Sequence, residues 1–81
     1  MQKKEIKKMD YPVIDVRGTG RNIRNMLNNR HISVADAARY LGATTSLVYR
    51  YIRGDVLPST DRLLALSIML DVTVNDILAV A

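Results

Sequence analysis

Cysteine, tryptophan and phenylalanine are absent from this chain of 81 residues, which has a single histidine, His31. Without cysteine there can be no disulfide, no zinc ribbon and no thiol nucleophile. His31 has no second histidine or cysteine with which to share a metal ion, so we expect no metal site. No apolar run approaches the roughly 20 residues that cross a bilayer. The charged N-terminus is not followed by the apolar segment of a secretory signal. We therefore expect a cytoplasmic protein without a membrane partner.

Patterns that support catalysis are also missing. The eight acidic residues are scattered, no glycine-rich phosphate loop is present, and the serines have no plausible histidine–aspartate arrangement. We therefore expect no enzyme activity, no cofactor and no small-molecule substrate. The length allows one small domain, and its marginal core would gain from dimerisation.

Positive charge is concentrated in the first two thirds of the chain. Residues 17–53 hold seven arginines against Asp36 alone, a net charge of +6, whereas residues 54–81 hold Arg62 against four aspartates, a net charge of −3. The four lysines within residues 1–10 add to the basic part. A polarised charge of this kind would steer a polyanion to one side of the molecule.

Helical periodicity and capping residues predict an all-α bundle of five helices at residues 19–81. Residues 1–18 precede it as a flexible basic arm with a segment at 11–16 that is rich in β-branched residues and can be extended. Ser33, Thr44 and Ser59 are expected N-caps, and Gly42 is an expected C-terminal stop. A capping box is expected at Ser33 with Asp36 and another at Thr73 with Asp76. The expected helices cover about 19–29, 34–41, 45–53, 60–70 and 74–80.

The third of these helices divides into two faces. At 100° per residue, one arc is apolar and the opposite arc carries hydroxyls and arginines but no acid. The apolar arc holds Leu47, Val48, Tyr51 and Ile52, and the polar arc holds Thr45, Ser46, Tyr49, Arg50 and Arg53. Such a polar face suits a helix that lies in the major groove of DNA.

Residues 19–79 resemble the lambda-repressor-like, Cro-like helix-turn-helix family of DNA-binding domains, also called XRE-type. The resemblance rests on an ordered set of features. They are IleSer at 32–33, Ala38, LeuGly at 41–42, Val48, Tyr51, Gly54, ProSer at 58–59, a leucine-rich helix and ValThrValAsnAspIleLeu at 72–78. The resemblance implies a regulator of transcription, repressor-like, that binds double-stranded DNA as a homodimer.

The family's contact positions can be transferred residue by residue. Arg50 is the main candidate for base readout, because a guanidinium can bind guanine O6 and N7 together. The implied base-contacting residues are Thr45, Ser46, Tyr49 and Arg50, and the implied phosphate-contacting residues are Ser33, Thr44, Arg53, Lys3 and Lys4. The N-terminal lysines are either an arm that follows the phosphates or an ordinary solvated tail.

The chain departs from the family pattern in three respects. Val34 stands where relatives often have a glutamine that clamps a phosphate. Leu27 and Ile52 stand where relatives often bury an arginine against a glutamate, and the joint loss leaves neither charge unpaired. Asp71 stands where relatives usually end the fourth helix with glycine, which should cost a little stability.

Two questions stay open at the level of sequence. A dimer could form through an apolar patch made by Ile68 and the C-terminus, or through edge-to-edge pairing of residues 11–16. The alternative function is a protein-interaction module, such as an antitoxin or adaptor, built on the same fold. In that case the fourth and fifth helices would bind another protein.

Overall fold

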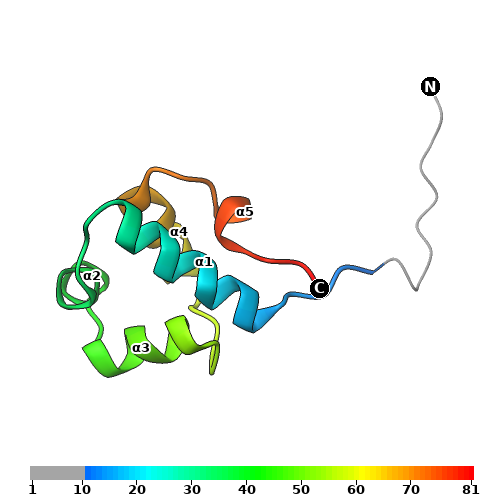
Figure 1. Ribbon diagram of the computed structural model, residues 1–81, viewed down its shortest axis with the longest axis horizontal. Helices are drawn as coiled ribbons and strands as arrows, with labels where there is room; N and C mark the ends of the chain where they lie inside the picture. Colours follow the sequence, from blue (N-terminus) through cyan, green and yellow to red (C-terminus); the bar gives the residue numbers. More distant parts are fainter. Residues whose placement is uncertain (1–10) are drawn as a thin grey trace.

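The computed structural model describes residues 11–81, and the predicted arm at 1–10, with Lys3 and Lys4, lies outside the described residues. Within residues 11–81 there are five α-helices and no strand longer than a single bridge. They are α1 (Val16–Asn29), α2 (Val34–Leu41), α3 (Thr45–Arg53), α4 (Thr60–Leu70) and α5 (Val74–Ile77). This is the five-helix, all-α fold that the sequence predicts. Figure 1 shows α1 crossing the middle of the molecule, with α2 and α3 to one side, α5 to the other and α4 behind.

One hydrophobic core joins all five helices. Its centre lies where α1 packs against α3, and α2, α4 and α5 close around it. Ala38 is buried on α2, as expected for two helices that cross closely. The buried apolar residues are Ile23, Leu27, Ala37, Ala38, Val48, Tyr51, Leu66, Leu70 and Ile77.

The ends of the middle helices follow the local capping signals. The hydroxyls of Ser33, Thr44 and Ser59 each accept a backbone N–H from the first turn of α2, α3 and α4. Gly42 ends α2 with a φ of 64°, a left-handed conformation that costs glycine little. Asp71 ends α4 with a φ of 55°, which an L-residue adopts at some cost. The boundaries of these three helices are therefore confirmed.

Helix α1 begins at Val16, three residues earlier than predicted. The carboxylate of Asp15 accepts the N–H of Gly18 at 3.0 Å and caps the helix. Gly18 and Gly20 are both helical and lie at close contacts. A β-carbon at Gly20 would lie 2.5 Å from the carbonyl oxygen of Ile52, so α1 can approach the α3 backbone only with glycine there.

The fifth helix ends at Ile77 and not near Val80 as predicted. Leu78 is extended, with φ −72° and ψ 131°, and the chain then returns along the beginning of α1. Ile14 and Val80 form an antiparallel bridge, through Asp15 N–H to Ala79 O and Ala81 N–H to Val13 O, both at 2.8 Å. The segment predicted to be extended at 11–16 thus pairs with the C-terminus of the same chain through this bridge, but it is shorter than predicted, because Val16 already belongs to α1.

Candidate nucleic-acid interface

The two faces predicted for α3 are present. Val48 and Tyr51 are buried, and Leu47 and Ile52 are partly buried against the core. The opposite face is open to solvent, and even the large Tyr49 side chain is 49% exposed. The exposed residues of α3 are Thr45, Ser46, Tyr49, Arg50 and Arg53, which include all four predicted base-contacting residues.

Ser33 and Thr44 lie at the N-termini of α2 and α3, and both are exposed. The Ser33 hydroxyl accepts the N–H of Asp36 at 3.0 Å, and the Thr44 hydroxyl accepts the N–H of Leu47 at 3.1 Å. An oxygen that accepts in this way still has its own O–H to donate. Each hydroxyl can therefore donate to a phosphate while it caps its helix.

Asp36 forms only half of the capping box that the sequence predicts. Its carboxylate accepts from Arg39 at 2.7 Å, and not from the backbone of Ser33. The Arg39 hydrogen bond is the main cause that lowers the pKa of Asp36, and the hydrogen bond with Ser33 adds to it. Asp36, which is the only acid within residues 17–53, is therefore ionised at neutral pH and paired with Arg39.

Two arginines of α3 have different surroundings. Arg50 makes no side-chain hydrogen bond or ion pair with residues 11–81, so its guanidinium is available to a ligand. Arg53 donates from Nε to Asp55 at 3.1 Å, and both side chains are largely exposed. An exposed ion pair of this kind is weak, so a phosphate can compete for the Arg53 guanidinium.

An open groove of about 320 Å³ lies between α1, the start of α2 and α3. Its apolar lining includes Leu27, Ile52 and Val34. Leu27 and Ile52 stand where relatives often bury an arginine against a glutamate, and Val34 stands where relatives often have a glutamine that clamps a phosphate. Polar groups from three elements complete the lining: Arg24 and Asn28 on α1, Ser33 before α2, and Tyr49 and Arg53 on α3.

Arg24 and Asn28 were not among the predicted contact residues. The signal was in the α1 sequence, because Leu27 was expected to face Ile52 of α3. Arg24 lies one turn before Leu27 on the same side of the helix, and Asn28 lies one turn after Arg24, at the edge of that side. This position places Arg24 and Asn28 next to α3.

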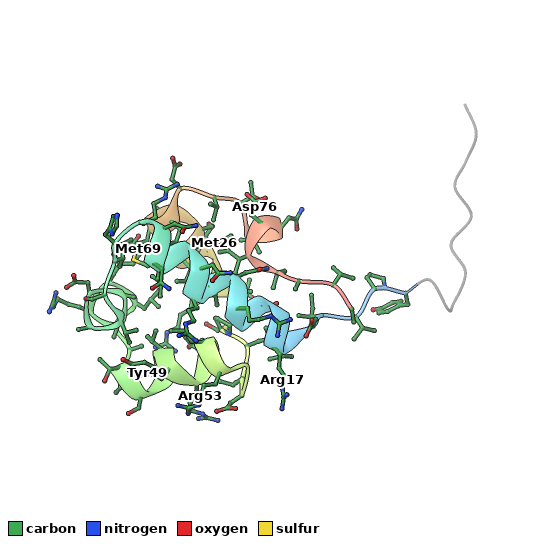
Figure 2. All side chains as sticks on the ribbon, viewed as in Figure 1. Arg17, Met26, Tyr49, Arg53, Met69 and Asp76 are labelled. Carbon is green, nitrogen blue, oxygen red and sulfur yellow. The ribbon has the colours of Figure 1, made fainter. Side chains whose placement is uncertain are left out.

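Basic residues gather on the α3 side of the molecule. Figure 2 shows Tyr49, Arg53 and Arg17 along one edge, with Asp76 at the opposite edge. Arg17 belongs to the first turn of α1, and Gly54, which ends α3, packs on its backbone. Thus the edge of the molecule at α3 carries arginines from both α1 and α3.

Helix α3, with its exposed polar face, follows α2 across the turn at Gly42. This arrangement matches a known family of domains. Residues 22–80 match the model of the Cro/C1-type HTH DNA-binding domain. The chain belongs to this family. The resemblance predicted from the sequence is thereby confirmed, and the protein carries a helix-turn-helix DNA-binding domain whose two motif helices are α2 and α3.

Solved structures with the same fold include proteins of different kinds. The restriction-modification controller protein C.AhdI from Aeromonas hydrophila is 24% identical, with a TM-score of 0.72 over 78% of this chain and 96% of that one. The clp gene regulator ClgR from Corynebacterium glutamicum is 16% identical, with a TM-score of 0.71 over 75% of this chain and 65% of that one. HppE, in complex with its substrate, is 15% identical, with a TM-score of 0.74 over 80% of this chain but 38% of that one. At these identities the likeness concerns the fold.

No curated protein matches the sequence significantly. None of the helices in residues 11–81 is long and apolar enough to span a membrane.

Proposed function

We propose that this Cro/C1-type HTH protein is a sequence-specific regulator of transcription, repressor-like, that acts in the cytoplasm. The observation that carries the proposal is the outward face of α3, where every exposed side chain is a hydroxyl, a tyrosine or an arginine. The names of two proteins with the same fold, a controller and a gene regulator, agree with it.

In this proposal α3 enters the major groove. Arg50 reads a guanine through O6 and N7, and Thr45 and Ser46 contact neighbouring base edges. Tyr49 packs on a sugar or a thymine methyl. Ser33, Thr44 and Arg53 hold phosphates on either side and fix the register of α3 in the groove.

We also propose that two copies bind one operator. Leu64 and Ile68, one turn apart on α4, are 56% and 64% exposed and form an apolar patch. The rival element at residues 11–16 is less available, because Val13 and Asp15 already bond to the C-terminus of their own chain. A two-fold axis at α4 would set two α3 helices about 34 Å apart, one turn of DNA, and require a pseudo-palindromic site.

Selection of bound duplexes from a random library tests this function. We expect a symmetric motif to be enriched. With Arg50→Ala, affinity for the selected duplex should fall about 5- to 150-fold, the equivalent of about 1–3 kcal/mol, and preference should relax at a single base pair of each half-site. No enrichment with the natural protein would reject sequence-specific binding.

A second function is favoured by one observation, the exposed Leu64 and Ile68 on α4. An antitoxin or adaptor would use this patch to bind a different protein. For such a protein, Ile68→Glu would abolish its action and Arg50→Ala would leave it intact. For a reader of operator sequences, Arg50→Ala should instead weaken the action, so Arg50→Ala is the variant that separates the two functions.

A further inference from the structure

Two arginines of α1 lie beside the C-terminal half of α3. Arg17 is fixed there because a β-carbon on Gly54, the residue that ends α3, would lie 2.6 Å from the Arg17 Cα. Arg24 lies farther along, where it lines the groove together with Tyr49 and Arg53 of α3. Seven residues at 100° each bring Arg24 within about 20° of Arg17 around the helix. Arg17 and Arg24, the α1 arginine row, therefore run along one side of α1 next to α3.

The charge of this row is not neutralised within residues 11–81. Both side chains are exposed, and neither forms an ion pair with an acid of the described chain. Their neighbour Arg21 differs, since its guanidinium lies 3.9 Å from the carboxylate of Asp15. An exposed row of unpaired guanidinium groups favours an anionic ligand.

The loop that follows α3 supplies no positive charge of its own. Residues 54–59 contain one acid, Asp55, which contacts Arg53, and no lysine or arginine. On this side of α3 the cations other than Arg53 come from α1. The rise along α1 separates Arg17 from Arg24 by about 10 Å, so the two guanidinium groups can reach different phosphates of one strand.

We infer that the α1 arginine row binds the sugar–phosphate backbone of the same duplex whose major groove receives α3. Arg24 and Arg53 hold a phosphate at the mouth of the protein groove between α1 and α3. The apolar floor of this protein groove, at Leu27 and Ile52, receives the adjoining deoxyribose. Arg17 holds a second phosphate beyond the end of α3. This assignment rests on the proposed function, and it adds α1 to the contact surface.

Binding isotherms measured against salt test the assignment. The variants are Arg17→Ala, Arg24→Ala and the double variant, and the duplexes are the selected operator and a random sequence of equal length. Each single variant should lower the magnitude of the log–log salt slope by about 0.9, and the double variant by about 1.8. Because phosphates carry no sequence information, the ratio of operator to random affinity should stay unchanged.

Arg30→Ala is the matched control. Arg30 is exposed and lies on the same chain segment, just after α1, but six residues from Arg24 and so about 120° around the helix. This variant loses the same charge and should change the salt slope by much less than either row variant. Far-UV circular dichroism should be unchanged in all of these variants, because none of the side chains is buried.

The outcomes separate this inference from the proposed function. Row variants that change the slope no more than Arg30→Ala overturn the inference, whether or not the operator is recognised. A changed operator-to-random ratio also overturns it, since the row would then read bases. If the natural protein fails to discriminate the operator, the proposed function fails, but slopes on random duplex still decide what the row binds.

Discussion

Two glycines of this domain are needed for different physical reasons. Gly20 has an ordinary helical conformation, but a β-carbon there would press on the carbonyl oxygens of Tyr51 and Ile52. Gly42 has open space around it, but its φ of 64° is unfavourable for an L-residue. Glycine is needed at position 20 because α1 and α3 lie close together there, and at position 42 because of the backbone conformation alone.

Alanine at these two positions should therefore have unequal effects. For Gly20→Ala we expect a loss of about 3 kcal/mol in the free energy of unfolding, because backbone atoms cannot rotate away from an overpacked contact. For Gly42→Ala we expect about 1 kcal/mol from the left-handed conformation. Urea denaturation of both variants measures the two losses. Equal losses would mean that α1 can move away from α3 at little cost.

At the scale of elements, α2, α3 and α4 could be predicted to the residue, whereas the start of α1 and the end of α5 could not. The caps of the middle helices involve residues three apart, such as Ser33 with Asp36, which a sequence displays directly. The first turn of α1 depends on the C-terminus, where the N–H of Ala79 donates to the Thr19 hydroxyl across 60 residues. The groove at α3 was missed for the same reason, since it needs three elements to be placed together.

The bond between Thr19 and Ala79 gives a prediction for the C-terminal segment. Thr19 is 1% exposed and its hydroxyl lies 2.9 Å from the Ala79 nitrogen. Thr19→Val keeps the shape but leaves that N–H without its acceptor, which should cost about 1–3 kcal/mol. The amides of Ala79 and Ala81 should exchange hydrogen faster in this variant. Thr60→Val, at an exposed position, should change neither the stability nor the exchange noticeably.

The capping box of α5 gives a prediction about pH. The backbone N–H and then the hydroxyl of Thr73 lower the pKa of Asp76. A carboxylate with a lowered pKa stabilises the fold above its unfolded pKa of about 3.9, and this stabilisation is lost as the pH falls through the folded value. The Tm difference between the natural protein and Asp76→Asn should be largest above pH 5 and become smaller as the pH falls below 4. A difference that is constant from pH 2 to 7 would contradict this.

At the scale of the whole molecule, the polar and apolar exposed surfaces lie on different helices. α3 and the α1 arginine row together carry four arginines, whereas α4 carries the exposed Leu64 and Ile68, with Arg62 as its single cation and Asp61 and Asp71 near its two ends. A dimer built on α4 would leave both copies of α3 free for one duplex. An interface on α3 would instead bury the arginines that the proposed function requires.

The oligomeric state of two variants therefore tests whether the dimer interface lies on α4. Ile68 is 64% exposed, so Ile68→Glu should preserve the fold while placing a carboxylate in each half of the proposed interface. We expect sedimentation to show a dimer for the natural protein and a monomer for this variant. Its affinity should fall for a duplex with two half-sites and stay the same for a duplex with one. Val13→Lys, at a position that is 61% exposed, is the control and should remain dimeric. If Val13→Lys dissociates the dimer and Ile68→Glu does not, the interface lies at the paired termini and α4 is free for another partner.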